Sequence, residues 1–209
     1  MIKVIRNPMK EIKSDFSKKE KRKNNIPVFL YIGRLSKEKG LDLLLEAIKD
    51  VEANLVIIGD GDMMKLCIDA AREIGREKVK VMGWQDESVI INQMLESDVL
   101  ILPSKVMETS GIVVREAAQY FLPSIVPDQG GVIEFVRDGV NGLYFEAGNK
   151  ESLISAMVKL IDDKSLAEKL GINARKFYEE FANNLSYHIN ELENFYIDII
   201  KSTKSSNTL

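Results

Sequence analysis

Short apolar runs alternate with amphipathic stretches over the first two thirds of this chain. The runs are apolar throughout instead of alternating with polar residues, which is typical of strands buried on both faces. They occur at residues 27–33, 54–59, 79–83, 98–103, 123–127 and 141–145. Apolar residues at helical spacing fill the intervals, at residues 40–49, 63–74, 88–96 and 112–120, with one further helical turn at 131–137.

Buried strands in alternation with helices predict an α/β fold, with a Rossmann-like parallel sheet covered by helices on both faces. The crossover connections should be right-handed. Ligands of such sheets bind beyond the carboxyl ends of the strands. Those ends fall at residues 33–34, 59–60, 83–84, 103–104 and 127–128, and the residues with the most distinctive chemistry lie there or directly after.

The chain becomes wholly helical after residue 148. Amphipathic spacing predicts helices at residues 150–162, 165–181 and 185–200. The sequence therefore predicts three parts: a linker-like basic segment at 1–24, a Rossmann-like domain with C-terminal helices at 25–200, and a disordered polar tail at 201–209.

The composition fits an ordinary globular protein, because 45% of the 209 residues are hydrophobic and can form a sizeable core. A net charge of −3 gives no indication of nucleic-acid binding. The single cysteine, Cys67, excludes an intrachain disulfide and fits a reducing cytoplasm. The sequence shows neither an apolar run of roughly 18 residues nor a signal peptide, so we predict a cytoplasmic protein.

Positive charge is concentrated near the N-terminus. Residues 10–24 hold seven Lys and Arg against three Asp and Glu, a local charge of +4 in a chain whose total is −3. Two interpretations are open: a solvated linker, and a segment that contacts an anionic membrane surface or a partner.

Two carboxylates flank a glycine in the segment 107–118. Glu108 precedes Gly111 in a loop, and Glu116 follows it just over one turn into the next helix. The N–H groups at the start of that helix are a natural seat for phosphate. Carboxylates accept hydrogen bonds from sugar and ribose hydroxyls, so the arrangement suits a nucleotide sugar.

A second group of candidate residues follows the first and third strands. Arg34 and Lys39 stand in a loop that enters a helix, where both could face one anion or simply be solvated. Trp84 follows the third strand, and its indole either stacks on a nucleobase or packs against the protein.

Three further features are weaker signals. The glycines at 59–61 lack the third glycine of a dinucleotide fingerprint and are interpreted as a tight turn. The glycine pair at 130–131 permits close approach of a ligand to the backbone, with Glu134 either in the site or on the surface. His188, the only histidine, is interpreted as a structural or surface residue, and no group of histidines and carboxylates has metal-ligand spacing.

Taken together, these motifs resemble the nucleotide-sugar-binding half of the retaining glycosyltransferases of family 4, which have the GT-B fold. The resemblance spans about residues 25–163 and rests on the order and spacing of motifs that are each weak alone. The set comprises Gly33-Arg34, Lys39-Gly40, Gly59-Asp60-Gly61, Ser97-Asp98, Pro103-Ser104, Glu108, Gly111, Glu116-Ala117, Pro123, Gly130-Gly131, Glu134 and Asn141-Gly142.

The resemblance implies how the phosphates of a sugar donor are held. Arg34 and Lys39, in the loop that begins at Gly33, would grip the diphosphate. Phosphate and sugar would also be held by three backbone amides, those of Gly111, Ile112 and Val113. The resemblance implies no metal and no cofactor besides the nucleotide-sugar substrate.

It also implies roles for side chains around the sugar, the ribose and the base. Glu108, the candidate catalytic residue, would face the transferred sugar, and Glu116 would bind the ribose hydroxyls. Trp84 and Gln85 would line the base. Transfer would retain the anomeric configuration.

The chain departs from the family in two respects. Family members have two such domains and about twice this length, with the acceptor site between the domains. The segment 4–8 resembles the linker that joins the domains, and the family's N-terminal catalytic histidine has no counterpart here. Thr109 and Ser110 stand where an aromatic residue often precedes the glycine, which would reshape the sugar pocket.

Two functional hypotheses follow. The first is the donor half of a cytoplasmic hexosyltransferase, inactive in isolation, which needs an N-terminal acceptor domain in cis or in trans. Its partners would include no nucleic acid, with a peripheral membrane contact as an option. The second is a module that binds a nucleotide or nucleotide sugar without chemistry of its own. A weaker third, a dinucleotide-dependent oxidoreductase, rests on residues 59–61 alone.

Overall fold

The computed structural model describes residues 26–109, 111–181 and 185–206. These residues fall into two compact units, one that ends at Tyr178 and one that begins at Glu179. The predicted basic segment at 1–24 and the last three residues of the predicted tail, 207–209, lie outside the described residues.

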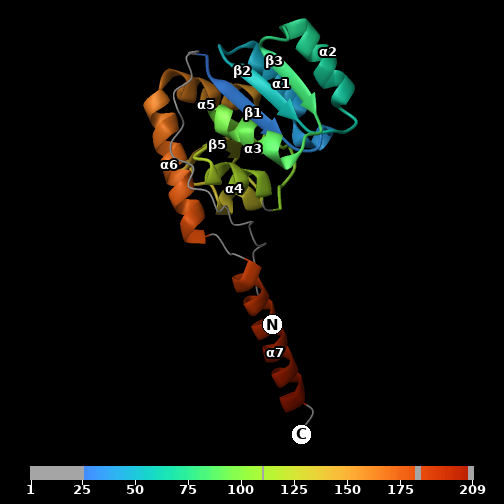
Figure 1. Ribbon diagram of the computed structural model, residues 1–209, viewed down its shortest axis with the longest axis vertical. Coiled ribbons are helices and arrows are strands. Elements are labelled where there is room, and N and C mark those ends of the chain that lie inside the picture. The colour runs from blue at the N-terminus through green and yellow to red at the C-terminus, as the bar shows by residue number, and fades with distance from the viewer. Residues whose placement is uncertain (1–25, 110, 182–184, 207–209) are drawn as a thin grey trace. The chain divides into compact units, whose positions relative to one another are not determined.

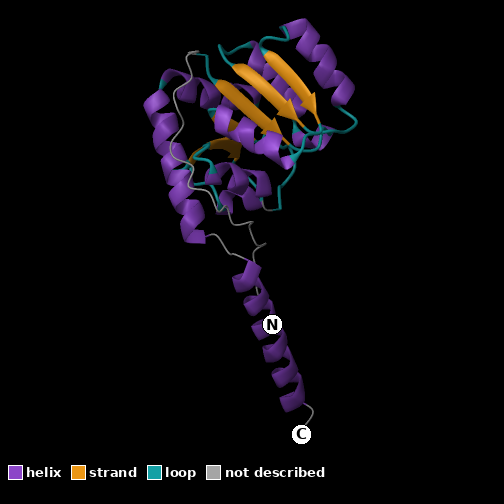
Figure 2. Cartoon of the chain, in the orientation of Figure 1, coloured by secondary structure: helices purple, strands orange, loops and turns teal. Residues whose placement is uncertain are grey.

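Six parallel strands form one sheet in the first unit, in the order β3-β2-β1-β4-β5-β6 (Figures 1 and 2). They are β1 (Val28–Ile32), β2 (Asn54–Ile58), β3 (Val79–Gly83), β4 (Val99–Ile101), β5 (Ser124–Pro127) and β6 (Gly142–Phe145). In the register, Phe29 of β1 lies opposite Leu55 of β2 and Val99 of β4. Each strand falls within a predicted apolar run, so the predicted α/β fold with a Rossmann-like sheet is confirmed.

Helices connect the strands and cover the sheet. They are α1 (Leu41–Lys49), α2 (Met64–Ile74), α3 (Glu87–Glu96), α4 (Ile112–Gln119), α5 (Lys150–Asp162) and α6 (Lys164–Phe181), with short 3₁₀ turns η1 (Lys37–Lys39) and η2 (Gly131–Glu134). Helices α1, α2 and α5 contribute to one buried cluster with the sheet, whereas α3 and α4 lie on the other face (Figure 1).

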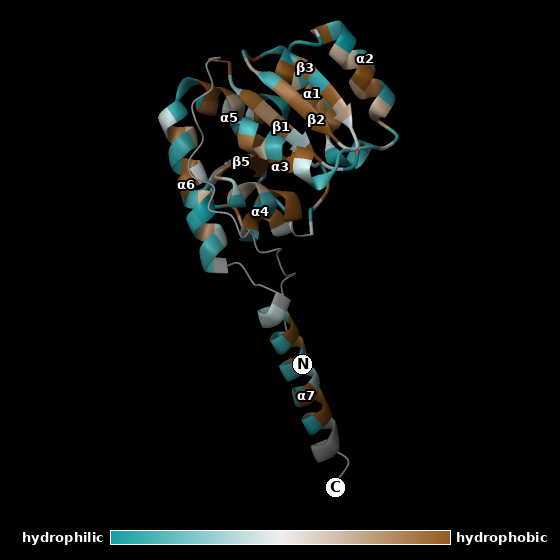
Figure 3. Cartoon of the chain, viewed as in Figure 1, coloured by the Kyte–Doolittle hydropathy of each residue, from teal (hydrophilic) through white to brown (hydrophobic). Residues whose placement is uncertain are grey.

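The strands are buried on both faces, as their uninterrupted apolar character predicts. Phe29 and Leu55 are fully buried in the layer that α1 and α5 cover. Leu30 and Leu100 are also fully buried, and strand alternation turns them to the opposite face. In Figure 3 most of β1 and β2 has the colour of hydrophobic residues. Burial of each such side chain stabilises the fold by roughly 1.5–3 kcal/mol.

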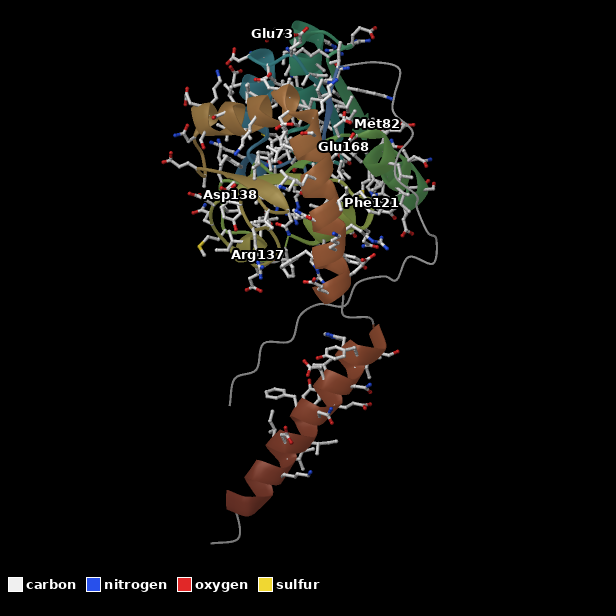
Figure 4. The ribbon with its side chains drawn as sticks, turned by 90° about the vertical axis from the view of Figure 1, so that its left-hand side faces the viewer. Glu73, Met82, Phe121, Arg137, Asp138 and Glu168 are labelled. Atoms are coloured by element: carbon white, nitrogen blue, oxygen red, sulfur yellow. The ribbon has the colours of Figure 1, made fainter. Side chains whose placement is uncertain are left out.

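Helix α6 is held against the chain segment that follows α4. A Cβ on Gly171 would lie 2.1 Å from the carbonyl oxygen of Phe121, so only glycine allows this approach. The Arg175 guanidinium donates to the Gln119 carbonyl at 2.7 Å and stacks 5.7 Å from the Phe121 ring centre. Figure 4 shows Phe121 beside α6.

Helix α7 (Leu185–Ser206) belongs to the second unit. It continues to Ser206, into the residues for which the sequence predicts a disordered tail. The segment 201–206 contains neither proline nor glycine, so nothing in it terminates a helix. Among the described helices, none combines the length and the apolar character that crossing a membrane would require.

Candidate functional site

The loops after β1 and β4 lie side by side at the carboxyl edge of the sheet. β1 and β4 are neighbours at the point where the strand order reverses, which is where open α/β sheets bind ligands. Gly40, with φ of 70°, lies so close to the β4 end that a Cβ would be 1.9 Å from the carbonyl oxygen of Pro103. Glycine at position 40 therefore allows the two loops to touch.

This contact brings together two predicted site residues. Lys39 Nζ lies 2.7 Å from Glu108 Oε1, although the residues are 69 positions apart in the chain. The same oxygen accepts a hydrogen bond from the hydroxyl of Ser104, a fully buried residue at the end of β4. The side chain of Glu108 is only 12% exposed and that of Lys39 is 26% exposed, so the pair is partly shielded from water.

The glycine pair at 130–131 supports the loop that carries Glu108. The Gly131 N–H donates to the Glu108 carbonyl oxygen at 2.5 Å. A Cβ on Gly131 would lie 2.0 Å from the carbonyl oxygen of Thr109. In the structure these glycines thus permit close approach of the protein's own Glu108 loop, whereas the sequence suggested approach of a ligand. Glu134 is exposed.

Helix α4 begins immediately after this loop. Gly111, with φ of 53°, is its N-cap in the left-handed conformation, and no side chain caps the helix. The first N–H groups of a helix have no acceptor within the helix. The amides of Ile112 and Val113 are in this first turn, so α4 begins with the amide arrangement that the sequence predicts.

Glu116 lies in α4, half-buried, and its environment disfavours its charge. Desolvation raises the pKa of the Glu116 carboxyl, and the nearby carboxylate of Glu87 raises it further. Glu87 is the first residue of α3. This association could not be predicted from the sequence, because α3 and α4 are separate elements and their side chains come near one another only in the fold.

Arg34 and Lys39 are the two cationic side chains predicted to hold the diphosphate. Within the described part of the chain, Lys39 is the one of the two that forms an ion pair. Arg34 is exposed, and its backbone carbonyl accepts a 2.7 Å hydrogen bond from the hydroxyl of buried Tyr31. That bond fixes the main chain directly after Gly33, whose N–H donates to the Ile58 carbonyl at 3.0 Å. The Arg34 guanidinium therefore extends from a well-anchored backbone.

The residues after β3 contribute an exposed aromatic ring. Trp84 is 70% exposed, so the interpretation that its indole packs against the protein is wrong. The Gln85 side-chain amide donates to the Met82 carbonyl at 2.7 Å, which leaves its oxygen for another donor. Among the described residues, no three His, Cys, Asp or Glu side chains are grouped as a metal would require.

The glycines at 59–61 form the predicted tight turn. Gly59 has φ of 140°, and a Cβ there would lie 1.8 Å from the Gly33 carbonyl oxygen. A Cβ on Gly61 would lie 2.4 Å from the Leu35 carbonyl oxygen. Both glycines therefore pack the end of β2 against the loop after β1. His188 lies in α7, in the second unit.

Three polar residues of this region were not predicted from the sequence to belong to the site: Asp42, Ser104 and Lys105. Lys105 forms an ion pair with Asp42 at 2.6 Å, and Ser104 donates to Glu108. Each is an ordinary polar residue in its own segment, and only the adjacency of β1 and β4 gives it a partner. For Ser104, the position after Pro103 at the end of a predicted strand was the sequence feature that could have indicated a site residue.

Comparison with other proteins identifies the family to which this chain is similar. The pattern of the family described as "Glycosyl transferases group 1" matches residues 12–177. The uncharacterized glycosyltransferase MJ1178 of Methanocaldococcus jannaschii is 31% identical over 153 residues, which cover 73% of this chain and 43% of that protein. Lipopolysaccharide 1,2-N-acetylglucosaminetransferase of Salmonella typhimurium is 31% identical over 182 residues, 78% of this chain and 46% of that protein.

Solved structures show the same fold. Anabaena Alr3699/HepE in complex with UDP-glucose superposes with a TM-score of 0.75 at 23% sequence identity, over 82% of this chain and 49% of that chain. The chain thus spans less than half the length of each of these three proteins. The structural neighbours are GT-B glycosyltransferases, as the sequence resemblance implied. With the family pattern matching most of its length, the chain belongs to the group 1 family of glycosyl transferases.

Proposed function

We propose that this chain is the sugar-donor-binding half of a retaining glycosyltransferase of the family 4 type. It would bind an NDP-sugar and present a hexose to an acceptor held by an N-terminal domain, in cis or in trans. The observation that carries the proposal is the Lys39–Glu108 pair at the strand-order reversal, directly before the N-terminus of α4.

Lys39 can serve two partners at once. An ammonium group has three N–H donors, and one of them is directed to Glu108. The others are free to reach a phosphate oxygen of the donor without breaking the ion pair. Lys39 would therefore tie the position of the diphosphate to that of the Glu108 carboxylate.

The remaining negative charge of the diphosphate would be stabilised by protein groups, without a metal ion. The amides of Gly111, Ile112 and Val113 and the dipole of α4 favour an anion at the helix N-terminus. Arg34 adds a planar guanidinium suited to two phosphate oxygens. We propose on this basis that donor binding is metal-independent.

The carboxylates would divide the recognition of hydroxyl groups. Glu108, partly buried and oriented by Ser104 and Lys39, would face the transferred sugar, and Glu116 would accept from the ribose hydroxyls. Exposed Trp84 would stack on the base, with the Gln85 oxygen beside it. The UDP-glucose complex of Alr3699/HepE supports this class of ligand for the proposed site.

A binding panel tests the proposal. UDP, GDP, ADP and their glucose derivatives are titrated into the protein by calorimetry and by thermal shift, without and with EDTA. We expect one nucleotide class to bind in both conditions and, at about 100 times its Kd, to stabilise the fold by about 2.7 kcal/mol. Glu116→Ala should weaken binding, whereas Glu52→Ala, an exposed carboxylate after α1, should not.

The outcomes separate the alternatives. Absence of binding by every compound contradicts a donor site in this chain. Binding that disappears with EDTA contradicts the metal-free arrangement. With the acceptor half supplied, proton NMR of the product should show the anomeric configuration of the donor. Binding without transfer in any such assembly would instead support a module that has no chemistry of its own.

A further inference from the structure

We propose that Lys105 and Asp42 are positioning residues for Glu108. Their ion pair fixes the loop 104–109 against the first turn of α1 and so sets where the Glu108 carboxylate stands relative to the transferred sugar. The inference rests on the proposed function, because it takes Glu108 to be the group that faces the sugar.

Lys105 attaches the loop to the η1–α1 segment in two ways. Its Nζ lies 2.6 Å from Asp42 Oδ2, and the two side chains are 35% and 38% exposed. Its backbone N–H donates to the Glu38 carbonyl at 2.9 Å. Main chain and side chain therefore hold the same residue to the segment that also carries Lys39.

Asp42 is a firm attachment point. It stands in the first turn of α1, and its Oδ1 accepts from the backbone N–H of Leu43 at 3.0 Å. Desolvation raises the pKa of Asp42, but the hydrogen bonds from Lys105 and from Leu43 outweigh it, so the pKa lies below its usual value. Asp42 is thus ionised at neutral pH, and a carboxylate near a helix N-terminus is itself favourable.

The stretch between Lys105 and Glu108 has no core packing of its own. Val106 is 44% exposed and Met107 is 72% exposed. Beyond Glu108, the loop is held by the Gly131 N–H, which donates to the Glu108 carbonyl. Without the Lys105 ammonium, only the main-chain hydrogen bond to Glu38 holds this end of the loop to the η1–α1 segment, so the exposed stretch can shift and carry the Glu108 side chain with it.

The chain offers a matched control for this ion pair. Lys150 Nζ lies 2.7 Å from Asp50 Oδ2, with side chains 33% and 51% exposed. This pair attaches the opposite end of α1, at its C-cap residue Asp50, to the start of α5. Its length and exposure resemble those of the Lys105–Asp42 pair, but it lies away from the Glu108 loop.

The first test measures discrimination between a nucleotide and its sugar derivative. Calorimetry on the full chain gives Kd for UDP, GDP, ADP and their glucose derivatives, with wild type, Lys105→Met, Lys105→Arg and Lys150→Met. We expect Lys105→Met to weaken binding of the NDP-glucose by roughly 2- to 5-fold, the range of an exposed ion pair, with little change for the NDP. Lys105→Arg should restore discrimination, and Lys150→Met should leave it unchanged.

The second test is independent of any ligand. Amide hydrogen exchange should become faster at Lys105 and Gly131 in Lys105→Met and in Asp42→Asn, but not in Lys150→Met. Equal exchange in all variants, or unchanged discrimination in Lys105→Met, would overturn the inference while donor binding stands. A wild type that binds none of the compounds would overturn the proposed function and this inference with it.

Discussion

Individual side chains of the candidate site are held from several elements at once. Glu108 accepts from Lys39, before α1, and from Ser104, after β4, while its backbone carbonyl accepts from Gly131 of η2. The sequence predicted Lys39 and Glu108 separately, from their positions after strands. Their ion pair could not be predicted, because residues 69 positions apart meet only once the strand order is known.

Lys39 provides a prediction about phosphate recognition. Lys39→Met removes a charged hydrogen-bond donor, so the affinity for the NDP identified in the panel should fall by about 10-fold or more. Calorimetry measures the loss, and higher ionic strength should reduce the difference between wild type and variant. Lys37→Met, in the same η1 turn but exposed, is the control and should change affinity little. An equal loss in both variants would point to general surface charge instead of a site.

Glu116 provides a prediction about stability and its pH dependence. Burial raises its pKa in the folded state, so the charged carboxylate opposes folding at pH values above that raised pKa. Glu116→Gln should therefore raise Tm at pH 7 while it weakens nucleotide binding. The Tm difference should shrink as the pH falls through the raised pKa and disappear below the carboxyl's unfolded pKa, about 4.3, because the carboxyl is then protonated in both states.

Thermal denaturation of wild type and Glu116→Gln from pH 4 to pH 8 checks this sign. Glu151→Gln is the control, because Glu151 is exposed on α5. A Tm for Glu116→Gln that is lower than wild type at pH 7, with intact binding, would contradict both the energetic role and the ribose assignment of Glu116.

At the scale of elements, apolar periodicity located every strand and α-helix of the first unit to within a few residues, whereas the 3₁₀ turn η1 lies in a stretch predicted as a loop. The uninterrupted apolar runs identified buried strands because both sheet faces are covered. What periodicity could not supply were the close backbone approaches that join elements. Gly40 against Pro103 and Gly131 against Thr109 depend on the fold, and a glycine in sequence shows only that such an approach is possible.

Gly171 gives the sharpest prediction at this scale. In an open helix interior, Gly→Ala stabilises by roughly 0.5–1 kcal/mol. Here the new Cβ would lie 2.1 Å from the Phe121 carbonyl oxygen, so we expect Gly171→Ala to destabilise by about 2 kcal/mol and to lower Tm by several degrees. Denaturant titration measures the change, with Lys169→Ala, exposed on the same helix, as control. A stabilised Gly171→Ala protein would show that α6 does not dock on Phe121.

At the scale of the whole molecule, the fold class could be predicted from the sequence, whereas the strand order could not. The alternation of strands and helices predicted a parallel sheet with its binding edge at the carboxyl ends. The order β3-β2-β1-β4-β5-β6 had to come from the structure, and it is this order that places the loops after β1 and β4 together. In this member of the group 1 glycosyl transferase family, the candidate site therefore lies at one edge of the sheet, beside the carboxyl ends of β1 and β4.

The most direct test of the account is an amide NMR titration of the labelled chain with the NDP-sugar that binds most tightly in the panel. The account predicts shifts concentrated at the carboxyl edge, in residues 33–40, 84–85, 104–109 and 111–116, with residues at the amino ends of the strands, such as Asn54, unaffected. Shifts that cluster at the amino ends, or that are absent at saturating ligand, would contradict a sugar-donor site between β1 and β4.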